Sequence, residues 1–171
     1  MSKDKRFWLT VATKKRKYKK EFSEYLGEKI DNLDQDEEEY YIQNSKLFEQ
    51  VLQDVEPNSL EVEYQKKLFE SMKIEGRYVE MEKEIETSNG IQRIDILEKI
   101  ETDTIIYELK INNITRKGIK QTIEYMKQTN SYIGHLVSFW KNTVKHYMIL
   151  KEEDSRYKMK TDEGVYMIII T

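Results

Sequence analysis

Two apolar runs near the middle of the chain carry acidic side chains where a folding chain normally places its core. Residues 91–97 (Ile-Gln-Arg-Ile-Asp-Ile-Leu) and residues 104–110 (Thr-Ile-Ile-Tyr-Glu-Leu-Lys) both read as β-strands, and a turn of three polar residues joins them. With a period of two, Asp95 lies on one face of the first strand, and Glu108 and Lys110 share one face of the second. Cross-strand neighbours in an antiparallel pair lie roughly 5 Å apart. Two acids and a lysine can therefore meet on one sheet.

Charged side chains on a core-facing surface are costly unless they are paired or bind a metal ion. Asp95 and Glu108 offer hard carboxylate oxygens, and the carbonyl of Leu109 is a candidate third ligand. An oxygen-only set of this kind suits magnesium or manganese, with water completing the octahedron. The alternative interpretation is a lattice of cross-strand ion pairs, Asp95–Lys110 and Arg93–Glu108, without a metal.

The composition fits one domain of ordinary size and excludes several kinds of site. The 171 residues suffice for a substantial core. The formal net charge is −3, so any nucleic-acid binding must come from a local patch. Cysteine is absent, which excludes disulfides, cysteine-ligated zinc and iron–sulfur clusters. No apolar run approaches the ~20 residues of a membrane span, and we expect a cytoplasmic protein, within a host cell if the source is viral.

The chain divides into an expected N-terminal helical extension, residues 1–57, and a main domain, residues 58–171. In the extension, apolar side chains recur at helical spacing, and a firmer helix between Tyr41 and Leu52 ends before Pro57. An acidic run at residues 31–39 precedes that helix and reads as a linker or as the helix start.

A basic run inside the extension is a candidate contact with phosphate groups. A solvated helix face is the alternative interpretation. The run consists of Lys14, Lys15, Arg16 and Lys17.

The main domain begins with a helix that Asn58 and Ser59 are expected to cap. Alternating residues 78–85 predict a half-exposed strand, and Asn89-Gly90 predicts a tight turn after it. A helix starting at Thr115 follows the second acidic strand.

Further strands are expected at residues 132–140, 145–151 and 165–170. We interpret the two histidines, His135 and His146, as sheet residues rather than metal ligands.

The residues around the two acids resemble a known family, the PD-(D/E)xK phosphodiesterase superfamily. The pattern Gly-x-x-Arg-x-Asp-Ile-Leu at residues 90–97 is similar to its metal-binding aspartate strand, and residues 108–110 (Glu-Leu-Lys) resemble the Glu-x-Lys half of its motif. Gln121 and Tyr125, at i and i+4 on the helix, are similar to the Gln-x-x-x-Tyr signature of the RecB-like and NucS-like branch. The resemblance covers roughly residues 58–140.

The resemblance implies an α/β fold with a restriction-endonuclease-like core, a mixed central sheet flanked by helices. It implies metal-dependent hydrolysis of phosphodiester bonds, with Mg or Mn held by Asp95, Glu108 and the Leu109 carbonyl. Lys110 would position or deprotonate the attacking water, or stabilise charge on the phosphate. The side chains of the Gln-x-x-x-Tyr signature would contact the nucleic-acid backbone or orient the lysine.

The same resemblance implies a further acid on the first helix of the main domain. Glu61 fits best, because apolar residues follow it three and seven positions later, and Glu63 is the runner-up. The expected partner is DNA, with RNA not excluded and a homodimer left open, and a short stand-alone chain suggests a viral, phage or mobile-element source. Two alternatives remain, a nucleic-acid-binding module that does not cleave and an interaction protein whose charges form the ion-pair lattice.

Overall fold

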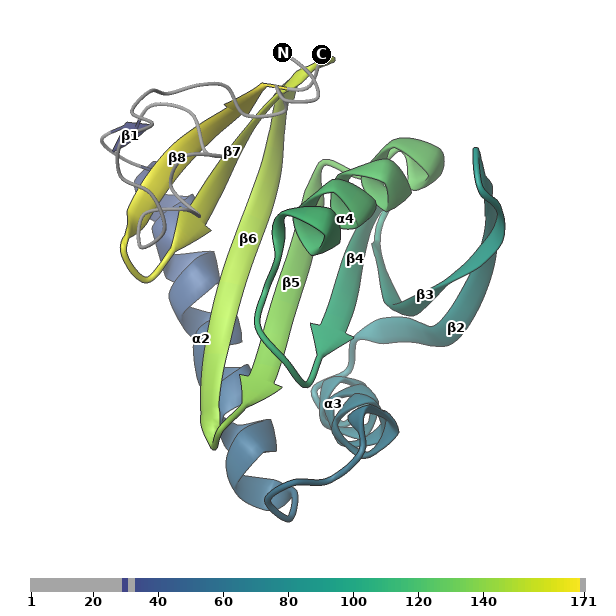
Figure 1. The fold of residues 1–171 in the computed structure, drawn as a ribbon, viewed down its shortest axis with the longest axis vertical. Helices are drawn as coiled ribbons and strands as arrows, with labels where there is room; N and C mark the ends of the chain where they lie inside the picture. Colours follow the sequence, from purple (N-terminus) through teal and green to yellow (C-terminus); the bar gives the residue numbers. More distant parts are fainter. Residues whose placement is uncertain (1–28, 31–32, 170–171) are drawn as a thin grey trace.

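One mixed β-sheet organises the protein, and helices cover both of its faces (Figure 1). The computed structural model describes residues 29–30 and 33–169. Its sheet has eight strands in the order β1-β8-β7-β6-β5-β4-β3-β2. The strands are β1 (Lys29–Ile30), β2 (Tyr78–Thr87), β3 (Gly90–Ile100), β4 (Asp103–Lys110), β5 (Ile133–Trp140), β6 (Thr143–Glu153), β7 (Arg156–Thr161) and β8 (Gly164–Ile169).

The strands pair antiparallel except for β4 and β5, which run parallel. Parallel neighbours need a crossover, and α4 (Arg116–Thr129) supplies it. A Cβ atom at Gly134 of β5 would lie 2.8 Å from Met126 Sδ of α4, so glycine lets the helix pack close to the sheet. This arrangement confirms the predicted mixed sheet with flanking helices.

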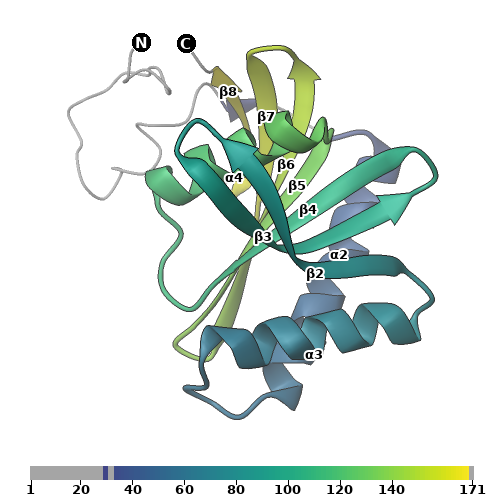
Figure 2. The same cartoon turned by 90° about the vertical axis from the view of Figure 1, so that its right-hand side faces the viewer.

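The two faces of the sheet hold separate apolar clusters. Helices α2 (Gln35–Asp54) and α3 (Glu61–Ile74) cover one face, and α4 covers the other, as Figures 1 and 2 show. Alternate residues of β4 serve the two sides: Tyr107 packs in the cluster under α2 and α3, and Ile106 packs in the cluster under α4. Glu108 therefore shares the α4 face of the sheet.

Helix α2 lies within residues 1–57 and packs directly on the sheet. Phe48 and Val51 are fully buried in the cluster that β4 and β5 share. At its start, Glu37 pairs with Lys158 of β7, with 3.1 Å between Oε1 and Nζ. The division of the chain at residue 57 remains a prediction. Among the described residues, no helix is long and apolar enough to cross a membrane.

The helix starts agree with the sequence at two places and differ at one. The predicted acidic run contains the start of α2, where Asp34 and Glu37 form a capping box. Thr115 caps α4 as predicted, because its Oγ1 accepts a hydrogen bond from the Gly118 N–H (3.1 Å). The expectation for α3 was wrong: Leu60 occupies the cap position without a side-chain bond, and Ser59 Oγ donates instead to the Glu56 carbonyl (2.6 Å).

Strand β7 was not predicted. Its buried residues, Tyr157 and Met159, alternate with Lys158 and Lys160, so the segment looks exposed in the sequence. The lysines are largely covered because their amino groups pair with glutamates of α2. These glutamates lie more than a hundred residues away from the lysines in the sequence, so a local sequence pattern cannot reveal the strand.

The two histidines are sheet residues, as predicted, and they join a buried polar chain under α2. His135 Nδ1 lies 2.8 Å from His146 Nε2. Tyr40 Oη lies 3.0 Å from His135 Nε2, and Ser45 Oγ lies 2.8 Å from His146 Nδ1. Burial lowers the pKa of His135 to about 3 and lowers that of His146 well below its usual value. Both rings are therefore neutral in the folded protein near pH 7.

We expect the two histidines to lower the free energy of unfolding as the pH drops below about 6.5, the ordinary pKa of histidine. Below that pH the unfolded chain binds protons that the folded chain excludes, and each histidine contributes a slope of up to about 1.4 kcal/mol per pH unit. Urea unfolding between about pH 7 and pH 5 measures the slope. A His135→Gln/His146→Gln double variant should show a much smaller slope, and an equal slope in both proteins would contradict the prediction.

Candidate active site

Asp95 and Glu108 lie side by side where β3 separates from β4. The ladder between the strands reaches the Ile96–Tyr107 pair and stops there. Beyond it the carboxylates take the place of the ladder bonds: the Asp95 N–H donates to Glu108 Oε2 (3.0 Å), and the Leu109 N–H donates to Asp95 Oδ2 (2.8 Å). Each acid is thus fixed by the backbone of the opposite strand.

The ladder between β2 and β3 is interrupted at the same residue. Met81 pairs with Ile96 and Lys83 pairs with Ile94, but no pairing joins Glu82 to Asp95 between them. Glu82 has a left-handed φ of 57°, a conformation that is uncommon for a residue other than glycine. Such strained residues persist only where the surroundings hold them, and they cluster at functional sites.

Gln65 of α3 occupies the gap that this interruption leaves. Its Nε2 donates to the Asp95 carbonyl (2.9 Å) and lies 3.4 Å from Glu82 Oε2. The side chain is 4% exposed, so it is held firmly between the helix and the sheet. The sequence motifs did not include Gln65, although it lies four positions after Glu61, on the same helix face, and this spacing was an available signal.

Burial raises the pKa values of the three acids, and neighbouring acids add to the rise for Asp95 and Glu108. Burial raises the pKa of Asp95 to about 6; the Leu109 N–H opposes the rise, and the charge of Glu61 adds to it. Burial, and next the charge of Asp95, raise the pKa of Glu108 well above its usual value. Burial also raises the pKa of Glu61, and nearby Lys110 opposes that rise. These four side chains, which the sequence placed on two strands and a helix, therefore act on one another.

The donor set fits a hard divalent cation. In an extended strand the N–H and C=O of one residue face the same neighbour, so the Leu109 carbonyl faces β3 beside the two carboxylates. Within the described part of the chain, no three His, Cys, Asp or Glu side chains are grouped closely enough to hold a metal by themselves. Magnesium is commonly held by one or two carboxylates together with water and substrate phosphate. Asp95, Glu108 and the Leu109 carbonyl match that pattern.

The ion-pair lattice does not form as the alternative interpretation required. Arg93 is exposed and pairs with Glu82 (3.6 Å) and Glu84 (3.5 Å) of the neighbouring β2. Within residues 33–169, no ion pair joins Arg93 to Glu108 or Asp95 to Lys110. Lys110 acts on both buried acids through its charge, but among the described residues neither acid has the direct ion pair that the lattice required.

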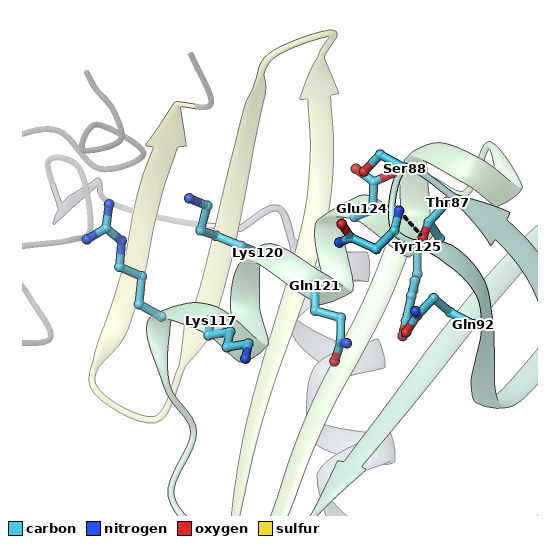
Figure 3. A pocket seen from close by; sticks show the side chains of 10 residues that line it. Thr87, Ser88, Gln92, Lys117, Lys120, Gln121, Glu124 and Tyr125 are labelled. Atoms are coloured by element: carbon cyan, nitrogen blue, oxygen red, sulfur yellow. Dashed lines mark hydrogen bonds between the residues drawn. The ribbon is translucent and has the colours of Figure 1, made fainter.

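A pocket beside the acids, here called the α4 pocket, contains both residues of the Gln-x-x-x-Tyr signature (Figure 3). Its volume is about 590 Å³. Tyr125 Oη donates to Gln92 Oε1 (3.3 Å), and burial, then the charges of Glu108 and Asp95, raise the pKa of Tyr125 to about 12. The pocket therefore adjoins the acids. It is lined by Thr87, Ser88, Asn89, Gln92, Arg116, Lys117, Lys120, Gln121, Glu124 and Tyr125.

The remaining predicted site residues are the acid of α3 and the N-terminal basic run. Glu61 is half-buried and acts electrostatically on Asp95, whereas the runner-up Glu63 is exposed. The basic run Lys14, Lys15, Arg16 and Lys17 lies outside the described residues.

The solved structures that resemble this chain include the following two, and both likenesses are slight. The crystal structure of SSO0001 is 17% identical with a TM-score of 0.38, covering 67% of this chain and 63% of that one. Hjc of Archaeoglobus fulgidus, a Holliday junction resolvase from an archaeal hyperthermophile, is 9% identical with a TM-score of 0.35, covering 61% of this chain and 86% of that one. The chain thus spans less than two thirds of SSO0001, and likeness at this level supports no argument about activity. No curated protein sequence matches the chain.

A family model covers more than half of the sequence. It is described as the PD-(D/E)XK nuclease superfamily and matches residues 37–149. The matched segment begins inside α2, upstream of the expected boundary at residue 57, and includes Asp95, Glu108 and Lys110. The chain belongs to the PD-(D/E)XK nuclease superfamily.

Proposed function

We propose that this protein is a metal-dependent nuclease that hydrolyses phosphodiester bonds in DNA. The observation that carries the proposal is the pair Asp95 and Glu108, two buried carboxylates fixed side by side with raised pKa values. Buried like charges are unfavourable without a cation, so the site favours binding of a divalent ion. Superfamily membership supports the nuclease class.

The roles proposed for the residues follow from their chemistry. Asp95, Glu108 and the Leu109 carbonyl would hold Mg²⁺ or Mn²⁺. The bound ion would supply Lewis-acid stabilisation of charge on the phosphate. Lys110 Nζ would hold the attacking water and take up its proton, or donate to a phosphate oxygen. Glu61, close enough to act on Asp95, would accept a hydrogen bond from the same water.

The α4 pocket would take the backbone of the substrate strand. Gln121 and Tyr125 supply hydrogen-bonding groups, and Lys117 and Lys120 supply positive charge on the same helix (Figure 3). On this basis we propose that the chain is a member of the RecB-like and NucS-like branch. A second contact is proposed for the basic run Lys14, Lys15, Arg16 and Lys17.

A binding module without cleavage is the second candidate function, favoured only if the acids fail to support turnover. The presence of Asp95, Glu108 and Lys110 together favours the enzyme, because a module that only binds needs none of them.

Cleavage should require magnesium or manganese, stop with EDTA and not be supported by calcium, whose coordination geometry is looser. Asp95→Asn and Lys110→Ala should each lower the rate by about 10²–10⁴-fold, the usual contribution of an acid–base or charge-stabilising group. Labelled single-stranded DNA, duplex DNA and RNA serve as substrates. The matched control is Lys99→Ala, which should cleave normally. Lys99 is exposed, lies on β3 with Asp95, and pairs with Glu80 of β2. Full activity in both site variants would defeat the proposal.

Neutralising one acid should stabilise the metal-free protein. Burial raises the pKa of Asp95 in the folded protein to about 6. Ionising Asp95 therefore costs more in the folded chain than in the unfolded chain, and the wild type loses free energy of unfolding as the pH rises through about 6. In EDTA near pH 8, Asp95→Asn and Glu108→Gln should therefore melt at the same temperature as the wild type or higher, by roughly 2–4 °C for each kcal/mol relieved. Magnesium should raise the melting temperature of the wild type and much less that of the variants. Lower melting temperatures in both variants under EDTA, with no magnesium effect on the wild type, would sink the metal site.

Gln65 should act as a positioning residue. Gln65→Leu removes the hydrogen bond to the Asp95 carbonyl, so we expect kcat to fall by about tenfold while KM changes little, since misplacement affects the reacting geometry more than binding. Lys66→Ala, its exposed neighbour on α3, is the control. A change confined to KM would argue that Gln65 serves substrate binding instead.

A further inference from the structure

A second pocket, here called the α3 pocket, lies at the start of α3. Its volume is about 480 Å³, within the range of small-molecule sites. It forms where the segment before α3, the residue after β4 and the β5–β6 turn come together. Its lining residues are Pro57, Asn58, Ser59, Tyr64, Ile111, Phe139, Trp140, Lys141 and Asn142.

The α3 pocket and the α4 pocket each adjoin a residue of the candidate active site. Ile111 of the α3 pocket directly follows Lys110, and Ser59 precedes Glu61 by two residues. Tyr125 of the α4 pocket is close enough to Glu108 for the charge to affect its pKa. Figure 2 shows the start of α3, the β4–α4 loop and the β5–β6 turn at one end of this surface, and the β2–β3 turn beside α4 at the other. A strand that occupied both pockets would therefore pass close to these residues.

The lining of the α3 pocket is aromatic, neutral and basic. Lys141 Nζ lies 4.5 Å from the centroid of the partly exposed Trp140 ring, and Tyr64 stacks on Phe139 with 4.6 Å between centroids. None of its lining residues is Asp or Glu, although the chain carries 32 acidic residues in 171. Aromatic rings beside a cation are the usual platform for unpaired bases, since the ring stacks on the base and the cation attracts the phosphate.

We propose that the α3 pocket binds one unpaired nucleobase of the substrate strand, stacked on Trp140, with Lys141 near the adjoining phosphate. The inference rests on the proposed nuclease function and adds the class of substrate. A base inside a duplex is already stacked and paired, so it enters such a pocket only after being unstacked at a cost of a few kcal/mol. The preferred substrate is therefore a single strand, a flap or a frayed end rather than an intact duplex.

Tryptophan fluorescence provides a test that does not depend on cleavage. The chain has two tryptophans, so Trp8→Phe leaves Trp140 as the sole emitter, and Lys110→Ala prevents cutting. A single-stranded oligonucleotide in magnesium should quench this emission, whereas an abasic oligonucleotide with the same phosphates and an intact duplex should quench it far less. Trp140→Ala should weaken binding of the single strand by about 5- to 150-fold, which corresponds to the loss of one stacked base, and Trp140→Phe should recover most of the affinity.

Tyr132→Ala is the matched control. Tyr132 also adjoins β5, at its opposite end, is 56% exposed and has Lys151 Nζ 5.6 Å from its ring centroid, but it lies outside both pockets. Its loss should leave affinity unchanged. Equal quenching by the abasic strand, equal or stronger binding of the duplex, or an equal effect of the two alanine variants would overturn the proposal.

The two proposals fail in different ways. If the wild type cleaves no nucleic acid with magnesium or manganese while base-dependent quenching persists, the base site stands and the nuclease proposal falls. If the wild type cleaves but Trp140 shows no base-dependent quenching, the base site falls and the nuclease proposal stands.

Discussion

The separation of β3 from β4 at Asp95 is the constraint on which the rest of the site depends. Two backbone N–H groups that would have paired strand to strand bond instead to the carboxylates of Asp95 and Glu108. These bonds favour the charged forms, while burial and mutual repulsion oppose them, and burial dominates. Without a cation the site therefore disfavours the charged forms of both carboxyl groups, and a divalent cation would offset this cost. A continuous ladder would have closed the gap and left no room for a cation.

Rigid packing on the opposite face supports this unfavourable arrangement. Tyr107, the residue before Glu108, points away from the acids, and its hydroxyl donates to Glu98 Oε1 (2.5 Å). Its ring stacks on His135 of β5 with 4.6 Å between centroids. Strand β4 thus directs Glu108 to the candidate active site and directs Tyr107, whose hydroxyl is hydrogen-bonded, to the core on the opposite face. Functional geometry of this kind is maintained when the supporting shell has few alternative conformations.

The sequence predicted those features of the site that depend on residues close together along the chain. Strand alternation placed Asp95, Glu108 and Lys110 together, and helical spacing placed Gln121 with Tyr125. Contacts between distant segments escaped it. Gln65 meets Asp95 across 30 residues of sequence, and the lysines of β7 are covered by α2, so neither shows in a local pattern. The prediction of the α3 cap was wrong for another reason. The Ser59 hydroxyl donates to the backbone carbonyl of Glu56, three residues earlier, instead of capping the helix.

Charge distribution explains how an acidic chain can guide a polyanion. With a net charge of −3, the molecule as a whole repels phosphate, and the outer strand β2 carries four glutamates at alternate positions. The two pockets depart from this background: the α4 pocket contains three cations and one acid, and the α3 pocket contains a cation and no acid. Exposed charges are screened beyond about 10 Å at moderate salt, so repulsion from β2 fades while contacts within the pockets persist. If the substrate is a nucleic acid, as proposed, this distribution would favour a strand that contacts the two pockets.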